Sequence, residues 1–514
     1  MGDLLLTGAT GLLGTYLIRD LMRAGTKLAV LVRPTKYASA QHRIETQLAV
    51  WEKQLGHALP RPVVLVGEIS QPGLGLSEAE AAWAAEHCTA LMHNAASLTF
   101  IAEEPDGEPW RSNVTGTRNV LDFCRTAGIK EFHHVSTAYV CGLRTDRCLE
   151  TELDVGQTLG NDYETSKVQS ETMVREADFL TDLTVYRPGI ITGDSQTGYT
   201  TTYHGFYVPL KLVSALIQKI ATLGMPREFL EQSIRGSGQR LREILGMSGL
   251  ERKNYVPVEW VSAAMTEIFR RRELHGKTYH LTPRESVPVR LAQEVMEEAF
   301  IESTEVAATA APREPQWNAE TDWAQFEQQF LSGMQVYRSY WRDDPVFDRT
   351  NVEQALPQLP CPEMDVDVLR TLVRFALESN FGWPRPPIVR PEFNLHEHLK
   401  PLTHGYNGHA VNAQALVGLQ VNGCGGGQWS LKLSEGTVVD VREGLNRACT
   451  AVFYLNSLTF ERLAKGESTA EQAIGAGRVL IEGNGVPLNE LARALQTVAV
   501  ADNAAVAGEA HRLQ

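Results

Sequence analysis

Tyr163 and Lys167 stand four residues apart, so a helix would place both side chains on one face. A nearby ammonium stabilises phenolate, so we expect Lys167 to lower the pKa of Tyr163 and make it a usable acid near neutral pH. Ser136 and Thr137 follow a strand predicted over Glu131–Val135. Ligand sites of open α/β sheets lie at such strand ends. Together, the hydroxyl of Ser136 or Thr137, the phenol of Tyr163 and the ammonium of Lys167 predict a site for proton transfer.

A glycine-rich turn near the start of the chain predicts a phosphate site. Gly8, Gly11 and Gly14 have the spacing G-x-x-G-x-x-G, between a strand predicted at Leu4–Thr7 and a helix predicted from Thr15 to Ala24. The first glycine permits a sharp turn, and the second lets the backbone approach a pyrophosphate. The third lets the helix pack closely on its strand, with its positive end toward phosphate.

Short apolar strands alternate with amphipathic helices from Asp3 to about Thr192, which predicts an α/β fold with a doubly wound parallel sheet. The predicted strands are Leu4–Thr7, Leu28–Val32, Val63–Val66, Ala90–His93, Glu131–Val135 and Leu183–Tyr186. After about Ser195 the pattern becomes less regular. We expect a lobe that covers the substrate there.

An aromatic stripe recurs at intervals of three and four residues, as on one face of a helix. Its members are Trp323, Phe326, Phe330, Met334, Tyr337 and Trp341. Two interpretations stay open, a helix packed on the domain core or one wall of a hydrophobic substrate channel.

The bulk composition excludes several classes of protein. A net charge of −14 over 514 residues argues against a general nucleic-acid binder and an anionic membrane surface. No apolar run approaches the roughly 18 residues of a transmembrane helix. A strand from Asp3 leaves no room for a signal peptide, and the seven cysteines contain no C-x-x-C pair. We therefore expect a cytoplasmic protein with reduced thiols.

Two histidine clusters do not predict a metal site. His133 and His134 are neighbours on a strand and so point to opposite faces. His396, His398, His404 and His409 lack cysteine partners and a helical i, i+4 spacing.

The motifs together resemble the extended short-chain dehydrogenase/reductase family from about Asp3 to Pro283. Thr7–Gly14 matches its T-G-x-x-G-x-x-G, Asn94–Ala96 its N-A-A, Asn113–Thr117 its N-V-x-G-T and Arg187–Gly193 its R-P-G-x-x-x-G. The resemblance implies a Rossmann-type fold.

The resemblance also implies a role for each site residue. Tyr163 is the proton donor, Lys167 binds the nicotinamide ribose, and Thr137 is the hydroxyl of the triad, with Ser136 left open. The implied cofactor-binding residues are Gly8, Thr10, Gly11, Leu12, Leu13, Arg33, Arg43, Glu68, Ile69, Asn94, Ala95, Ala96, Asn113, Tyr163, Lys167, Pro188, Gly189 and Ile190.

The end of the second strand indicates which dinucleotide is bound. Family members specific for NAD place an acidic residue there, whereas this chain has Arg33, and Arg43 lies where related reductases carry a second arginine. A guanidinium suits a 2′-phosphate, so NADPH is predicted over NADH. The alternative is that Arg33 stacks on adenine and both cofactors bind. Glu68 replaces the aspartate that usually contacts adenine.

Within the family, the chain looks most like thioester reductases and fatty acyl reductases. The similar segments are Leu31–Arg33, Val135–Val140 and Asn254–Val261. The resemblance implies reduction of a hydrophobic acyl thioester, bound to CoA or to an external carrier protein, to an aldehyde or alcohol, and a homodimer. The alternatives are an NAD(P)-dependent dehydrogenase, ketoreductase or epimerase of a sterol, isoprenoid or quinone-like substrate, and a redox-silent lipid-binding protein.

The C-terminal segment is a smaller α+β pattern that resembles the sterol carrier protein 2 family. The matching segments are Gly425–Trp429, Phe460–Gly466 and Ala476–Asn484. The resemblance implies a helical layer on a sheet around an apolar tunnel. The alternative is an accessory or dimerisation domain whose tunnel is filled.

The predicted domain order follows from these segments. We expect an NADP-binding reductase domain over 1–285 with its substrate lobe at about 195–285, a helical extension over 286–383, a Pro-rich linker over 384–404 and the carrier-like domain over 405–500.

Overall fold

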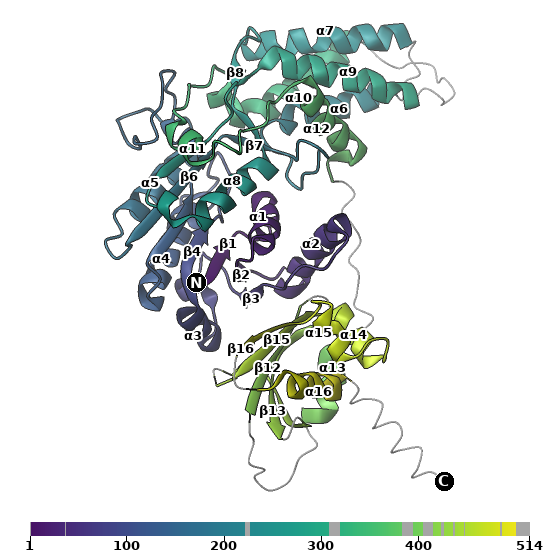
Figure 1. Cartoon of the computed structure of the whole chain (residues 1–514). Helices are drawn as coiled ribbons and strands as arrows, with labels where there is room; N and C mark the ends of the chain where they lie inside the picture. The colour runs from purple at the N-terminus through teal and green to yellow at the C-terminus, as the bar shows by residue number, and fades with distance from the viewer. Residues whose placement is uncertain are drawn as a thin grey trace.

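A computed structural model shows a parallel sheet, a helical lobe above it and a smaller sheet below it (Figure 1). The structure describes residues 2–35, 38–221, 227–307, 319–382, 394–403, 415–422, 426–434, 437–446, 448–483 and 486–499. No helix within these ranges is long and apolar enough to cross a membrane.

The large sheet has seven parallel strands in the order β10-β6-β5-β4-β1-β2-β3, which confirms the Rossmann-type architecture. Its strands are β1 Asp3–Thr7, β2 Leu28–Val32, β3 Val63–Val66, β4 Cys88–His93, β5 Glu131–Val135, β6 Asp182–Pro188 and β10 Thr278–Leu281. The last of these lies within the segment predicted as the substrate lobe. Instead, it forms an edge of the main sheet beside β6.

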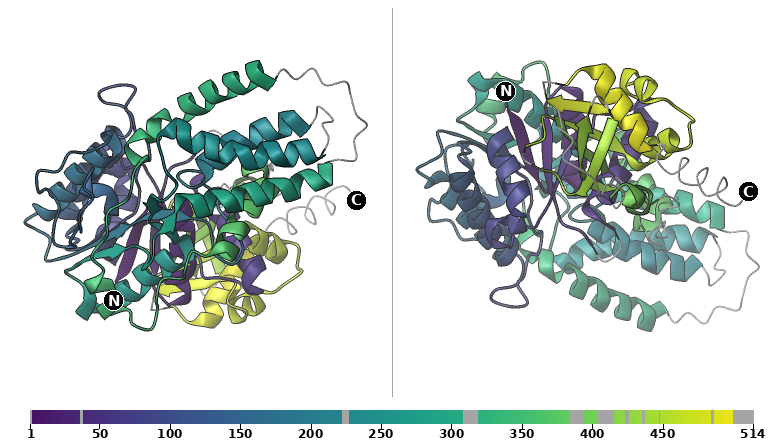
Figure 2. Two further views of the ribbon diagram at one scale, coloured as in Figure 1. Left: turned by 90° about the horizontal axis from the view of Figure 1, so that it is seen from above. Right: turned by 90° about the horizontal axis from the view of Figure 1, so that it is seen from below.

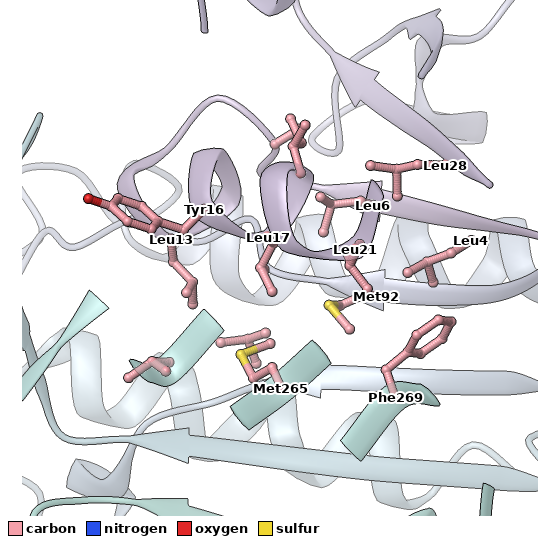
Figure 3. Packing of buried hydrophobic residues seen from close by; sticks show 14 of the residues in the cluster. Leu4, Leu6, Leu13, Tyr16, Leu17, Leu21, Leu28, Met92, Met265 and Phe269 are labelled. Atoms are coloured by element: carbon pink, nitrogen blue, oxygen red, sulfur yellow. The ribbon is translucent and has the colours of Figure 1, made fainter. Parts of the chain in front are cut away.

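Alternating side chains bury both faces of this sheet. Leu4 and Leu6 contribute to the apolar cluster on one face, and Leu5 to the cluster on the other. Six helices supply the two outer layers. One layer has α1 Leu12–Arg23, α2 Ala40–Leu55 and α8 Val258–Arg270, and the other α3 Glu78–His87, α4 Gly116–Ala127 and α5 Asp162–Arg175. In Figure 3, Leu17 and Leu21 of α1 point toward Met265 and Phe269 of α8.

Short elements connect these layers to the rest of the chain. They are η1 Pro72–Gly75, η2 Arg111–Thr115, η3 Ala138–Cys141, β7 Ile190–Thr192, β8 Arg252–Lys253, β9 Tyr255–Pro257, η4 Arg272–Leu274, β11 Val287–Pro288, η5 Gln335–Tyr340, α11 Thr350–Ala355 and η6 Asn380–Gly382. Strand β7 pairs with β9, and β8 with β11, near the junction of sheet and lobe.

The helical lobe is built from both sides of the predicted boundary at residue 285. Its long helices are α6 Tyr207–Ala221, α7 Arg227–Leu245, α9 Val289–Ala307, α10 Ala319–Met334 and α12 Val366–Glu378 (Figure 2). They share one apolar core, with Leu210, Phe300, Phe330 and Leu372 fully or almost fully buried. The predicted lobe and helical extension therefore form one unit, because neither set of helices buries its apolar stripe alone.

The aromatic stripe is not one continuous helix. Helix α10 ends at Met334, and the 3₁₀ turn η5 follows it. Phe330 and Met334 are buried in the lobe core, and Tyr337 and Trp341 pack against that core. The side chains of the first two members of the stripe lie outside the described part of the chain.

The C-terminal unit has a five-stranded sheet in the order β14-β13-β12-β15-β16. Its elements are α13 Leu395–Thr403, β12 Ala415–Asn422, β13 Gly427–Ser434, β14 Thr437–Glu443, β15 Ala451–Asn456, α14 Ser457–Ala464, α15 Ala470–Gly475, β16 Leu480–Gly483 and α16 Leu488–Ala499. Helix α13 lies within the predicted linker 384–404. It forms because Leu395 and Leu399 bury completely in the core of this unit; residues 383–393, with the proline-rich run, lie outside the described residues.

Helices α13 to α16 cover one face of the C-terminal sheet. The other face of this sheet packs against the large sheet near the amino ends of β1, β2 and β3. Tyr454 of β15 is fully buried in the apolar cluster that contains Leu5. The Asn422 side-chain amide donates to the Pro62 carbonyl at 3.4 Å, and Lys27 pairs with Glu482 at 3.7 Å. We call this contact the docking face.

Candidate active site

One cavity of about 710 Å³ joins the carboxyl edge of the parallel sheet to the interior of the helical lobe. It brings together the predicted catalytic residues and every predicted cofactor-binding residue except Asn113. These lining residues are Gly8, Thr10, Gly11, Leu12, Leu13, Arg33, Arg43, Glu68, Ile69, Asn94, Ala95, Ala96, Thr137, Tyr163, Lys167, Pro188, Gly189 and Ile190.

The glycine-rich turn forms a cradle at the start of α1. Gly8 has a φ of +68°, and a Cβ there would lie 2.6 Å from the Ala95 backbone nitrogen. A Cβ on Gly14 would lie 2.1 Å from the Gly8 carbonyl oxygen, so only glycine permits this approach of helix to strand. The nearest atom to a Cβ on Gly11 would be 3.5 Å away. This open backbone at a helix N-terminus fits a dinucleotide pyrophosphate.

Two arginines lie at the end of β2. The Arg43 guanidinium donates to the Thr10 hydroxyl at 2.6 Å and to the Arg33 carbonyl at 2.7 Å. The Arg33 guanidinium, 63% exposed, pairs with Glu68 at 3.1 Å. Burial and the Arg33 charge both lower the pKa of Arg43. These two like charges meet at the edge of the cavity, which fits an anionic group of the cofactor.

Tyr163 and Lys167 lie one turn apart on α5, as the spacing predicts. Burial raises the pKa of Tyr163 to about 12, although a hydrogen bond from the Thr137 hydroxyl opposes this rise. The expectation of a lowered pKa for Tyr163 is therefore wrong here, because burial raises it and the opposing hydrogen bond comes from Thr137 and not from Lys167. The phenol stays protonated at neutral pH, as a proton donor requires.

Lys167 is held beneath the site by the strand that precedes Thr137. Its Nζ donates to the Val135 carbonyl at 2.8 Å, and the side chain is buried. Burial lowers the pKa of Lys167 to about 8, with Glu171 opposing the change.

The structure separates the two candidate hydroxyl residues. Thr137 hydrogen-bonds Tyr163, whereas the buried Ser136 hydroxyl makes no hydrogen bond within the described residues and helps to lower the pKa of Glu171. Glu171 also pairs with the buried Arg187 guanidinium at 2.6 Å. Thr137 is therefore the hydroxyl beside the phenol, and Ser136 also lines the cavity without a contact to Tyr163 among the described interactions.

Asn113 lies behind the cavity wall, in the π-helical turn η2. Its Nδ2 donates to the Ser166 hydroxyl at 2.9 Å, and its Oδ1 accepts from the Ser97 backbone at 2.7 Å. These bonds join the loop after β4 to α5. Asn113 can thus position Tyr163 without lining the cavity.

Aromatic residues that the sequence motifs did not reveal surround Tyr163. Phe100 lies with its ring centroid 5.6 Å from Tyr163, 5.0 Å from Tyr337 and 5.5 Å from Tyr340. All four rings line the cavity. Tyr337 belongs to the aromatic stripe, so the periodicity was a usable signal for that residue.

Asp344 holds the segment after η5 against the site. Its carboxylate accepts from Tyr139 Oη at 2.6 Å, from Lys253 Nζ at 2.8 Å and from the Asn254 backbone at 3.0 Å. No local motif marks Asp344, because its partners come from distant parts of the sequence.

The sequence model of a known family, described as Male sterility protein and NAD-binding, matches residues 6–265. This range contains the glycine cradle, Thr137, Tyr163 and Lys167. The chain belongs to the Male sterility protein family. Membership supports an oxidoreductase of the extended short-chain type that uses a nicotinamide dinucleotide.

Among the curated proteins that this chain resembles are reductases. The chain is 26% identical over 412 residues to aldehyde reductase lnaA of Aspergillus flavus, which covers 73% of this chain and 36% of that protein. It is 30% identical over 257 residues to the isonitrile lipopeptide synthase of Mycobacterium tuberculosis, covering 46% of this chain and 10% of that protein. The chain thus spans about a third or less of the length of these two relatives.

This chain also resembles a solved structure of a reductase domain. The terminal R domain from the myxalamid PKS-NRPS biosynthetic pathway is 27% identical, with a TM-score of 0.56. The match covers 75% of this chain and 93% of that domain.

Proposed function

We propose that this chain is an NADPH-dependent reductase that converts a hydrophobic acyl thioester to an aldehyde, and in a second cycle to an alcohol. The continuity of the cavity carries this proposal. Polar groups at the sheet edge, including Tyr163, open directly into an apolar interior supplied by the lobe. Its apolar lining includes Leu210, Val213, Leu241, Met296, Phe300, Phe330 and Met334. An aliphatic chain fits this interior, with its carbonyl beside Tyr163.

NADPH is favoured by the two guanidiniums at the end of β2. A 2′-phosphate there would accept charge-assisted hydrogen bonds from Arg33 and Arg43. The cradle of Gly8 and Gly11 would hold the pyrophosphate, and Lys167 the nicotinamide ribose. The bound cofactor supplies the hydride that reaches the acyl carbon.

The protein residues act on the acyl oxygen. Tyr163 and Thr137 donate hydrogen bonds to it and stabilise the negative charge that develops there. Tyr163 then transfers its proton, and the Lys167 cation stabilises the remaining phenolate. The resulting hemithioacetal breaks its carbon–sulfur bond and releases an aldehyde and a thiol. In the first cycle one hydride and one proton are consumed and one thiol is released, whereas in the second cycle a further hydride and proton reduce the aldehyde to the alcohol without release of thiol.

We further propose that the thioester is delivered from outside this chain, on CoA or a carrier protein, to a cytoplasmic enzyme. Relatives named as a lipopeptide synthase and as an R domain of a PKS-NRPS pathway support a carrier-bound substrate. A homodimer stays a prediction from the family resemblance.

For the C-terminal unit we propose a lipid-carrier-like role. A helical layer packs on one face of its sheet around a wholly apolar cluster, which includes Leu419, Phe453, Phe460 and Leu495. A helical layer on one face of a sheet is the arrangement that the family resemblance implies, and an apolar ligand would need space within this core, while a filled core would leave the unit a structural accessory. Mass spectrometry of hydrophobic molecules bound to the full-length protein, compared with those bound to the segment after Pro391, separates these two roles.

The deciding experiment follows NADPH oxidation, free thiol and aldehyde in parallel with a series of acyl-CoA thioesters of increasing chain length. We expect equal amounts of thiol and aldehyde at first turnover, and rates that rise with chain length as the apolar cavity fills. NADPH oxidation with hydrophobic ketones but without thiol release would instead assign a ketoreductase. No oxidation with either class would assign a redox-silent binding protein.

A further inference from the structure

A cluster of histidine and carboxylate side chains lies far from the cavity, near the amino ends of β5 and β6. Glu131 and His133 share one face of β5, and Asp182 pairs with Glu131 on the neighbouring strand. His275 enters from the loop before β10. His133 and His275 are buried, and the Glu131 side chain is 13% exposed. We propose that Glu131, His133, His275 and Asp182 form a structural zinc-binding site.

The ligand atoms of Glu131, His133 and His275 lie within 4.8 Å of one another, and Asp182 lies beside His275. His133 Nε2 lies 3.3 Å from Glu131 Oε1, His275 Nδ1 lies 3.9 Å from the same oxygen, and His275 Nδ1 lies 3.1 Å from Asp182 Oδ2. Zinc bound by nitrogen and oxygen at about 2.0–2.1 Å in a tetrahedron separates its ligand atoms by roughly 3.3 Å. Small side-chain shifts would bring the Glu131, His133 and His275 atoms to one ion, and the Asp182 carboxylate, which lies beside His275, would move toward it as the fourth ligand.

The hydrogen bonds around the cluster direct lone pairs toward its centre. His275 Nε2 lies 2.9 Å from the Phe269 carbonyl, which only accepts, so this nitrogen carries the hydrogen. In the neutral ring, Nδ1 then presents a lone pair to two carboxylates. A cation between these atoms would remove the repulsion between the Nδ1 lone pair and the two carboxylates. The hydrogen bond from Nε2 to the Phe269 carbonyl is the kind that histidines which ligate metals commonly make with their other ring nitrogen.

The remaining groups around the cluster also have partners. His133 Nδ1 lies 3.0 Å from the Tyr186 hydroxyl, which fixes the ring with Nε2 toward Glu131. Arg272 donates to Glu131 Oε2 at 3.1 Å, leaving Oε1 for the cluster. A surface hollow lined by Arg175, Asp182, Arg272 and His275 provides an entry path.

The adjacent pair His133 and His134 did not predict this site, because only His133 belongs to it. The His134 ring lies on the other face of β5, where it neighbours His93 with a centroid distance of 5.8 Å. The second histidine of the cluster is His275, from a distant part of the chain. With four protein ligands, an ion here would tie β5, β6 and the loop before β10 together.

Metal analysis of the full-length protein tests this assignment. After chelator treatment, the protein is exposed to Zn²⁺, desalted and measured for bound zinc and for its melting temperature. We expect about one zinc per chain and a melting temperature raised by several degrees through preferential binding to the folded state. His275→Gln and His133→Gln should abolish both effects, while His57→Gln, at an exposed histidine, should retain them.

The outcome does not depend on catalysis, so failure of this site and failure of the reductase proposal are distinguishable. Absence of stoichiometric zinc in the wild-type protein would overturn the proposal and assign the cluster to an imidazolium ion pair. Equal zinc retention by His275→Gln and the wild type would overturn it as well. Cobalt substitution adds a check that does not require a stable variant, since a tetrahedral site gives intense visible absorption that an ion pair cannot.

Discussion

The seven-stranded and five-stranded sheets of this chain use buried polar residues in opposite ways. In the parallel sheet helices cover both faces, and the polar groups that line the cavity gather at the carboxyl edge. Thr137 and Lys167 face the cavity there. In the C-terminal sheet one face is apolar, and the other buries Gln420, Asn422 and Tyr454 against the large sheet. Position in the sheet thus separates polar groups suited to chemistry from those suited to docking.

The same contrast appears in how local the sequence signals are. The edge of the parallel sheet is formed by short motifs, because each βα turn contributes neighbouring residues. The docking face is formed by pairs such as Asn422 with Pro62. These residues become neighbours only after two separate sheets have formed.

Loss of the phenol at the carboxyl edge should have the largest effect. We expect Tyr163→Phe to reduce kcat by about 10²–10⁴-fold, since general acid catalysis contributes that much. The dissociation constant for NADPH should change little. Steady-state kinetics and fluorescence titration measure the two quantities, with Tyr199→Phe, outside the cavity lining, as the matched control. Unchanged turnover would remove Tyr163 from the mechanism.

Truncation of Tyr454 should have the next largest effect, on stability instead of catalysis. We expect Tyr454→Ala to cost about 3–5 kcal/mol, as for other buried aromatic residues. Tyr454→Phe removes only the hydrogen bond to Glu482 at 3.0 Å and should cost about 1 kcal/mol. Denaturant unfolding and kcat are measured together. A large loss of kcat in folded Tyr454→Ala would show that the docking face and the active site are coupled.

Asp3 makes the docking face sensitive to pH. Burial and the Glu482 charge raise the pKa of Asp3 from 3.8 to about 6. The folded state therefore favours the protonated acid, and this stability is present below pH 3.8 and lost as the pH rises through 6. Asp3→Asn should stabilise the protein at pH 8 by on the order of 2–3 kcal/mol and little at pH 4.

Unfolding of Asp3→Asn across this pH range is compared with Asp178→Asn, whose carboxylate is 88% exposed. A gain from Asp3→Asn that is equal at pH 4 and pH 8 would contradict the assigned cause.

Loss of the Arg33 guanidinium, which we expect to select NADPH over NADH, should have the smallest effect. We expect Arg33→Ala to raise KM for NADPH by roughly tenfold, equivalent to about 1.4 kcal/mol, through loss of one charge-assisted hydrogen bond. KM for NADH should stay the same, and the exposed Arg23→Ala provides the control. Equal losses with both cofactors would indicate that Arg33 stacks on adenine instead of binding a phosphate.

Much of the parallel sheet could be predicted because its signals are local. The strands at Leu28–Val32, Val63–Val66 and Glu131–Val135 have the predicted bounds. The glycine turn, Thr137, Tyr163 and Lys167 lie in the predicted cavity, since each motif is fixed by its own βα unit. The pKa of Tyr163 could not be predicted, because it depends on burial by Phe100 and other rings from distant segments.

Other features depended on tertiary contacts that spacing does not reveal. The lobe joins helices on both sides of residue 285, since only together do they bury their apolar stripes. Helix α13 forms in the predicted linker because Leu395 and Leu399 find a core to enter. Asp344 receives hydrogen bonds from Tyr139 and Lys253, so its importance arises only in the folded chain.

The position of the docking face at the amino ends of β1–β3 has a thermodynamic consequence. Tyr454, Asn422 and Pro62 do not line the cavity, whereas Leu31, which belongs to the same apolar cluster as Tyr454, does. Substitutions at sites without shared partners have nearly additive free energies. We therefore expect substitutions at Asn422 or Pro62 to alter attachment of the C-terminal unit with little effect on cofactor affinity.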